Sequence, residues 1–292
     1  MGFRSGRCYV AAVYDAMSLL EETKYLAKKY RLRPDTDRGQ NFLISETVLD
    51  AIVAAASVTA SETVLEIGTG LGTLTKALAG QAAKVITVES DRRLEPFLKQ
   101  LPKQHLNIHL LLNDITKVKF SDISEELGSR YSVVANIPYY ITGKIVEQLL
   151  TWEIVPQSIV LLVQLEVAKK YCAVAGDMSK QSLAAQFYSQ PEIIEKVPAK
   201  SFWPVPAVDS AILRLNNVHS WDYDASEKEV WQLIRIGFSS KRKKLVNNLA
   251  SGLQITKTEA EKLLSATGVN VNVRAEDLSK EEWVTLTLKL KH

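Results

Sequence analysis

An alternation of strand-like and helix-like segments between residues 45 and 190 constrains the fold more than any other feature of the chain. Short apolar runs rich in β-branched residues recur there, separated by amphipathic stretches of helical period such as 73–79 and 143–152. Strands that alternate with helices form a mostly parallel sheet with helices on both faces. The five predicted strands are Thr63–Ile67, Lys84–Val88, Leu106–Leu112, Tyr131–Ala135 and Ile159–Val163.

The pattern changes toward the C-terminus. Two more strands, Ile193–Val197 and Ser210–Leu215, are expected as an antiparallel pair at one edge of the sheet. Beyond them we predict three helix starts, because Ser/Thr-x-x-Glu is the capping box of a helix N-terminus. The matches are Ser226/Glu229, Thr258/Glu261 and Ser279/Glu282. We therefore predict an N-terminal extension (1–33, partly helical or disordered), an α/β domain (34–216) and a helical domain (217–292).

Composition excludes several classes of protein. The 292 residues are 46% hydrophobic with a net charge of +3, and no apolar run approaches the roughly 18 residues of a membrane span. Cys8 and Cys172 form no Cys-x-x-Cys, so neither a disulfide framework nor a zinc knuckle is expected. His105 and His109 have no further ligands nearby, and we predict no metal. We expect a cytoplasmic monomer without a signal peptide; a start at Met17 or an organelle presequence would also explain the first residues.

A glycine-rich turn follows the first predicted strand, in the sequence Glu66-Ile-Gly-Thr-Gly-Leu-Gly72. Glycines between a strand and a helix let a ligand approach the backbone closely. The spacing differs from the Gly-x-Gly-x-x-Gly of a pyrophosphate site, and a glycine turn used only for packing remains an alternative.

Acidic residues follow the next two strands. Glu89 lies 21 residues after Gly68, where a carboxylate can bind both ribose hydroxyls of a nucleoside. Asn113 and Asp114 follow the third strand and could accept from an adenine amine. Carboxylates at successive strand ends attract a cationic cofactor and repel a dinucleotide phosphate. The pattern favours S-adenosylmethionine, although each carboxylate alone could be a solvated group or a helix cap.

The fourth strand ends in Asn136-Ile-Pro-Tyr139, which indicates methylation of an exocyclic amine. The lone pair of adenine's amine is delocalised into the ring, so acceptors for both N–H groups would make the nitrogen more nucleophilic. The Asn136 side-chain oxygen and a backbone carbonyl near Ile137 could supply them, while Pro138 fixes the turn. Tyr139 offers a stacking face worth roughly 1–3 kcal/mol. A plain strand terminator is the alternative.

From residue 23 onward the chain resembles the small-subunit ribosomal RNA adenine dimethyltransferase family of the KsgA (RsmA) type. The resemblance includes the glycine turn and the Asn-Ile-Pro-Tyr turn. Three further motifs carry it: Gly39-Gln-Asn-Phe-Leu43, Phe202-Trp-Pro-Val-Pro-Ala-Val-Asp-Ser210 and Arg274-Ala-Glu-Asp-Leu-Ser279. It implies a seven-stranded class I, Rossmann-like methyltransferase domain with a small C-terminal all-helical domain.

The resemblance also implies an activity. Two methyl groups would pass from S-adenosylmethionine, leaving S-adenosylhomocysteine, to each of two adjacent adenosines near the 3′ end of 16S-type rRNA in the assembling small subunit. The cofactor would touch Asn41, Leu43, Gly68, Glu89, Asp114 and Asn136. The target adenine would lie between Tyr139 and Phe202, unless Phe202 is a core residue. Two acids in Pro34-Asp-Thr-Asp-Arg38 replace the usual lysines, and Ser45 replaces an acid.

The densest basic run is Ser239-Ser-Lys-Arg-Lys-Lys244, which we assign to a helix. A solvated helix face is one interpretation of such a run. Beside the methylation motif we favour phosphate binding by Lys241, Arg242 and Lys244.

Three other functions remain open. A resistance methyltransferase of 23S rRNA would share Gln-Asn-Phe-Leu and Asn-Ile-Pro-Tyr, but the Arg274–Ser279 motif favours the small-subunit enzyme. A DNA adenine methyltransferase fits the chemistry and is disfavoured by the basic tail. A non-enzymatic ribosome-assembly factor would have no need of Glu89, Asp114 or Asn136.

Overall fold

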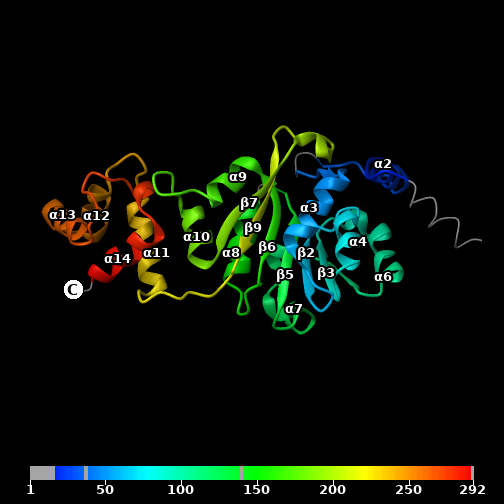
Figure 1. The fold of residues 1–292 in the computed structure, drawn as a ribbon, viewed down its shortest axis with the longest axis horizontal. Helices are drawn as coiled ribbons and strands as arrows, with labels where there is room; N and C mark the ends of the chain where they lie inside the picture. The colour runs from blue at the N-terminus through cyan, green and yellow to red at the C-terminus, as the bar shows by residue number, and fades with distance from the viewer. Residues whose placement is uncertain (1–16, 36–38, 139–140, 291–292) are drawn as a thin grey trace, which may run out of the picture. The chain divides into compact units, whose positions relative to one another are not determined.

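The computed structural model describes residues 17–35, 39–138 and 141–290. They form a seven-stranded sheet of order β4-β3-β2-β5-β6-β9-β7, with helices on both faces (Figure 1). The neighbours from β4 to β6 are all parallel. The sheet strands are β2 (Thr63–Ile67), β3 (Lys84–Glu89), β4 (Ile108–Leu112), β5 (Tyr131–Asn136), β6 (Ile159–Gln164), β7 (Gln190–Val197) and β9 (Ser210–Asn216).

The strand predictions are confirmed, with small differences at the ends. The prediction for β2 matches the observed strand, and the last two strands are neighbours at one edge. The central strands are fully buried, since Val64, Val133 and Val160 have no exposed surface. The helices before and between them are α3 (Glu46–Ala56), α4 (Thr73–Ala79), α5 (Glu95–Leu98), α6 (Leu101–Gln104), α7 (Phe120–Leu127), α8 (Thr142–Leu150), α9 (Leu165–Tyr171) and α10 (Lys180–Tyr188).

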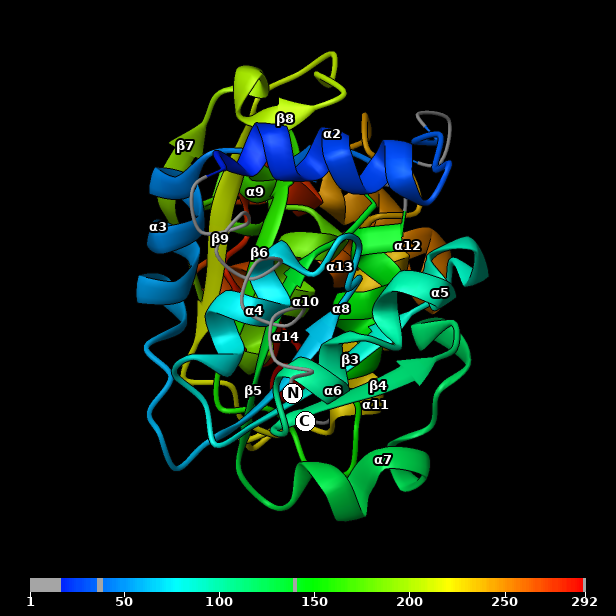
Figure 2. The same ribbon diagram turned by 90° about the vertical axis from the view of Figure 1, so that its right-hand side faces the viewer.

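A second, two-stranded sheet joins two distant motifs. Strand β1 (Phe42–Leu43) pairs antiparallel with β8 (Phe202–Trp203), so that Phe42 faces Trp203 and Leu43 faces Phe202. Figure 2 shows helix α2 (Leu19–Lys29), in dark blue, running across the upper part of unit 1. Helix α2 begins with a capping box on Ser18, and its Leu26 joins the hydrophobic core. Residues 1–16 of the predicted extension lie outside the described residues, and its described part contains a packed helix from Leu19 to Lys29.

The chain divides into two compact units that do not follow a single boundary near residue 217. Unit 1 comprises 1–165 and 193–214, and unit 2 comprises 166–192 and 215–292. Segment 166–192 groups with the C-terminal helices because its α10 is bound to them. Tyr188 donates to Glu227 at 2.6 Å, and Lys280 Nζ donates to the Gln186 carbonyl at 2.8 Å.

Unit 2 contains four further helices, α11 (Glu227–Gly237), α12 (Leu245–Leu253), α13 (Lys257–Ala266) and α14 (Lys280–Lys289). The capping box Ser279/Glu282 is confirmed, with Glu282 N–H bound to Ser279 Oγ at 3.2 Å. Ser226 is the N-cap residue of α11, but its side chain makes no cap hydrogen bond. The prediction Thr258/Glu261 is wrong, because the box at the start of α13 is Thr256/Glu259.

Candidate functional site

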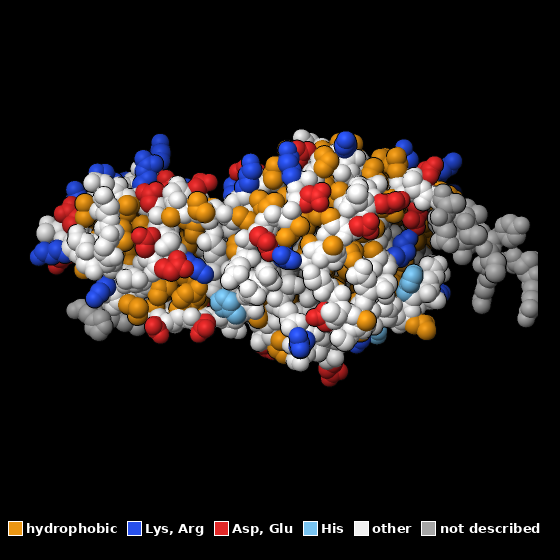
Figure 3. All heavy atoms as spheres, in the orientation of Figure 1, with side chains coloured by type: hydrophobic (Ala, Val, Ile, Leu, Met, Phe, Trp, Pro, Cys, Tyr) orange, Lys and Arg blue, Asp and Glu red, His pale blue; other side chains and the backbone are white. Residues whose placement is uncertain are grey.

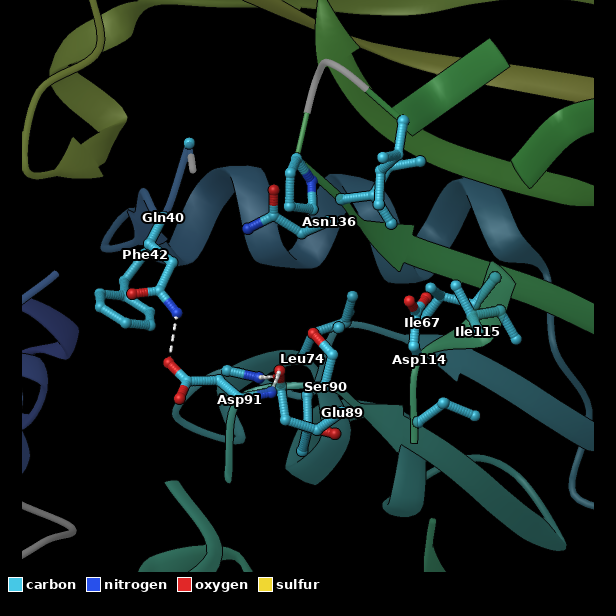
Figure 4. A pocket seen from close by; sticks show the side chains of 18 of the residues that line it. Gln40, Phe42, Ile67, Leu74, Glu89, Ser90, Asp91, Asp114, Ile115 and Asn136 are labelled. Atoms are coloured by element: carbon cyan, nitrogen blue, oxygen red, sulfur yellow. Dashed lines mark hydrogen bonds between the residues drawn. The ribbon is translucent and has the colours of Figure 1, made fainter. Parts of the chain in front are cut away.

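A cavity of about 530 Å³ opens at the carboxyl ends of the parallel strands in unit 1. Its position follows from topology: the strand order reverses direction at β2, and such switch points leave a crevice beyond the carboxyl ends. Figure 4 shows Glu89, Asp114 and Asn136 around this cavity, each at the end of a different strand. The six predicted cofactor residues all line it: Asn41, Leu43, Gly68, Glu89, Asp114 and Asn136.

The glycine turn forms one wall of the cavity. Gly68, Gly70 and Gly72 have φ values of +85°, +54° and +74°, in the region that glycine adopts without strain. A Cβ atom on Gly68 would lie 3.1 Å from the carbonyl oxygen of Asn136. The turn after β2 and the turn after β5 are therefore in close backbone contact.

Glu66 supports this turn from below. It has no exposed surface, and its Oε2 accepts from the hydroxyls of Thr75 and Thr87 at 2.6 Å each. Thr87 Oγ1 also lies 2.6 Å from Thr69 Oγ1, inside the glycine turn. Burial raises the pKa of Glu66 to about 8, although the two hydrogen bonds from Thr75 and Thr87 act to lower it. Glu66 thus ties β2, β3 and α4 together behind the cavity.

Glu89 is held in place by backbone donors. Its Oε2 accepts from Gly70 N–H at 2.9 Å and its Oε1 from Asp91 N–H at 2.8 Å. Burial raises the pKa of Glu89, while these N–H groups act to lower it. Each carboxylate oxygen keeps a further lone pair for a ligand hydroxyl.

Asp114 and Asn136 complete the polar lining. Burial acts to raise the pKa of Asp114, but hydrogen bonds from the Thr116 hydroxyl and N–H outweigh it. Lys117 and Lys144 add to the lowering, and the pKa of Asp114 falls below its ordinary value. The Asn136 Nδ2 donates to the Asn41 carbonyl in a long hydrogen bond of 3.5 Å. This leaves Asn136 Oδ1 as an acceptor.

Sequence reasoning missed one group at the cavity. Gln40 Nε2 donates to Asp91 Oδ2 at 2.7 Å (Figure 4). Arg93 forms an ion pair with the same carboxylate at 2.6 Å. This group fixes the segment before β1 to the turn after β3. Gln40 belongs to the Gly-Gln-Asn-Phe-Leu motif, and Asp91 lies two residues after Glu89. Their closeness to predicted cofactor residues in the sequence could have identified them as part of the site.

The structure describes one of the two predicted stacking residues, Phe202, and places it away from the cavity. Tyr139 lies outside the described residues. Phe202 has no exposed surface, belongs to the hydrophobic core and does not line the cavity, which corrects the expected position beside a bound base. The alternative of a core residue is what the structure shows, and a stacking role would require the ring to leave the core. The partly exposed aromatic residue of β8 is its neighbour Trp203.

The basic run lies in a turn, not on a helix. All four cations from Lys241 to Lys244 are exposed between the end of α11 and the start of α12. Asn248 Nδ2 bridges this turn, donating to the carbonyls of Gly237 at 2.5 Å and Ser240 at 3.1 Å. Lys244 Nζ donates to Asn272 Oδ1 at 2.7 Å.

The cavity residues fit S-adenosylmethionine. Ligand pockets of roughly 300–1,000 Å³ are typical for molecules of this size. Carboxylates of Glu89 and Asp114 suit a ligand with a positive charge, ribose hydroxyls and an amine, and the glycine turn admits close backbone approach. Within the described ranges no cluster of three or more His, Cys, Asp or Glu could hold a metal ion, and no helix is long and apolar enough to cross a membrane.

Residues 32–292 match the family described as ribosomal RNA adenine dimethylase. This chain belongs to the ribosomal RNA adenine dimethylase family. Curated relatives named ribosomal RNA small subunit methyltransferase A include one from Dehalococcoides mccartyi, 40% identical over 280 residues and 95% of each chain. One from Alkaliphilus metalliredigens is 37% identical over 273 residues, covering 91% of this chain and 95% of the relative.

Solved structures agree with the family assignment. The crystal structure of the 23S rRNA methyltransferase ErmE has a TM-score of 0.71 at 26% identity, covering 86% of this chain and all of that one. A dimethyladenosine transferase from Plasmodium falciparum has a TM-score of 0.70 at 26% identity, covering 86% and 97%. The class I methyltransferase fold expected from the sequence is confirmed, and S-adenosylmethionine is the cofactor of this adenine dimethylase.

Proposed function

We propose that this adenine dimethylase methylates the exocyclic amines of two adjacent adenosines near the 3′ end of small-subunit rRNA, giving dimethyladenosine in the assembling subunit. The observation that supports it most is that the cofactor residues expected from the family motifs line one cavity together with Asn136. The relatives that cover almost the full chain are named small-subunit methyltransferases. We also propose that the protein acts as a cytoplasmic monomer.

Bound S-adenosylmethionine would supply an electrophilic methyl group. Glu89 would bind the ribose hydroxyls and Asp114 the adenine amine, with Asn41, Leu43 and Gly68 closing the pocket around them. Asn136 Oδ1 would accept one N–H of the target amine, because its Nδ2 is already directed to the Asn41 carbonyl. A carbonyl near Ile137 would accept the other N–H, and Tyr139 would stack on the base. No general base is needed, since the proton can leave after transfer.

RNA would be held by the exposed turn of Lys241, Arg242 and Lys244 in unit 2. Asn248 shapes this turn through two backbone carbonyls, so the cations stand on a fixed loop and need little ordering when they meet phosphates.

The test is transfer of labelled methyl groups to undermethylated small subunits, followed by mapping of the modified nucleotides. We expect Asn136→Ala to lower kcat about a hundredfold, as loss of one preorganised polar group at a reacting centre does. Asn136→Asp keeps an acceptor oxygen and should retain more activity. Equal rates in Asn136→Ala and the unchanged protein would contradict the proposed role.

A second candidate is methylation of 23S rRNA, which the likeness to ErmE favours. Label mapped to large-subunit rRNA would support it. Association with small subunits without methyl transfer would support a non-enzymatic assembly factor.

A further inference from the structure

An apolar patch borders the cofactor cavity on the β1 side. We define the Trp203 patch as Phe42, Trp203, Val205 and Val208. Phe42 lines the cavity, and its ring stacks on that of Trp203 with 6.5 Å between centroids and 24° between planes. Val205 and Val208 are 65% and 46% exposed in the following loop. In Figure 3 hydrophobic side chains lie among Lys and Arg at the upper margin of unit 1.

The patch is continuous with the proposed catalytic centre. The Phe42 ring lies 3.5 Å from the position of a Cβ on Gly70, in the glycine turn. The residue before Phe42 accepts from Asn136 Nδ2 through its carbonyl. Trp203 therefore lies one aromatic ring beyond the glycine turn, and the residue that precedes this ring in the chain, Asn41, contacts the Asn136 side chain.

The backbone around the patch is fixed before any ligand binds. Ile44 N–H donates to the Ser201 carbonyl at 2.9 Å on one side of Trp203. On the other side Asp209 closes the loop, accepting from Ala199 N–H at 3.0 Å through its side chain and from Leu165 N–H at 3.0 Å through its carbonyl. A partly exposed aromatic surface held in this way loses little conformational freedom on binding.

We infer that Trp203 stacks the base of the nucleotide adjacent to the target adenosine, an inference that rests on the proposed function. Unpaired RNA bases stack on aromatic side chains whatever their identity, because every base has a π-face. Lys200, exposed on the same segment, places a cation near the intervening phosphate. While one adenine lies at Asn136, its neighbour needs a surface that keeps it unstacked, and the Trp203 patch provides one.

The test compares Trp203→Leu and Trp203→Phe with the unchanged protein on a fragment of small-subunit rRNA that contains both adenosines. A matched fragment carries an abasic nucleotide beside the target adenosine. We expect Trp203→Leu to weaken binding of the complete fragment about five- to 150-fold. Trp203→Phe should remain within a few-fold of the unchanged protein. The abasic fragment should bind all three proteins alike, and the affinity for S-adenosylhomocysteine should not change.

Each contrary outcome has a distinct meaning. Equal affinity of Trp203→Leu for the complete fragment would overturn the inference. A loss of the same size on the abasic fragment would mean that Trp203 acts only on the fold. A loss confined to particles that contain ribosomal proteins would identify a protein as the occupant of the patch. Failure of the proposed function is recognised separately, by absence of methyl transfer in the unchanged protein.

Discussion

The contact between Gly68 and the Asn136 carbonyl predicts how one methyl group would impair catalysis. In Gly68→Ala the new Cβ would lie 3.1 Å from the Asn136 carbonyl oxygen, so one of the two turns must move by a few tenths of an ångström. A misplacement of about 1 Å can cost a hundredfold in rate, so we expect kcat to fall about three- to tenfold. The positive φ of Gly68 adds a loss of stability of roughly 1–2 kcal/mol.

Gly128→Ala is the matched control. Gly128 has a φ of +71°, close to that of Gly68, but no atom lies within 4 Å of the position of its Cβ. Both variants should lose stability in chemical denaturation, because both put alanine at a positive φ; the loss should be larger at Gly128, whose ψ of −164° lies in a region essentially confined to glycine. Only Gly68→Ala should also slow single-turnover methyl transfer to undermethylated subunits. Native rates in Gly68→Ala, or an equal loss of rate in Gly128→Ala, would refute the reasoning.

Three further predictions concern stability and RNA binding. Because burial raises the pKa of Glu66 from 4.5 to about 8, the folded state holds its proton more tightly, and stability falls as the pH rises through this window. Glu66→Gln should flatten that dependence in urea denaturation at a series of pH values; an unchanged slope would contradict it. Replacing Lys241, Arg242 and Lys244 by Gln should weaken RNA binding and reduce the slope of log K against log salt by about 2. An unaltered salt titration would argue against phosphate contacts. In Gly237→Ala the new Cβ would overlap the Trp283 ring, so we expect thermal unfolding to show a loss of stability of about 1–3 kcal/mol. Calorimetry should show an unchanged affinity for the cofactor. Unchanged stability would mean that the side chains around Gly237 can rearrange to make room.

The sheet and the cofactor cavity were predictable because local signals and topology agree there. Strands such as β6 are buried on both faces, and the first five residues of β6 form a continuous apolar run. Once the strands are parallel, their carboxyl ends meet at one edge, and residues such as Glu89 and Asn136 are brought together without further information. The sequence pattern therefore contained the site's main geometry.

The wrong predictions concern places where two local structures fit the sequence equally well and only tertiary packing distinguishes them. Two overlapping Thr-x-x-Glu boxes, at Thr256 and Thr258, fit the same sequence, and the observed register is the one that buries Ala260 and Leu264. Adjacent strand residues point to opposite faces, so Phe202 and its neighbour could exchange roles until β8 was placed. Segment 166–192 joins unit 2 through long-range bonds that no periodicity records.

The pairing of β1 with β8 has a consequence for synthesis. Leu43, which lines the cofactor cavity, pairs with Phe202, so the strand partner of this cavity wall lies almost 160 positions later in the chain. A nascent polypeptide that has only just extended past the Asn-Ile-Pro-Tyr turn still lacks this strand partner. The enzyme would thus become competent late in translation, after most of it has left the ribosome that makes it.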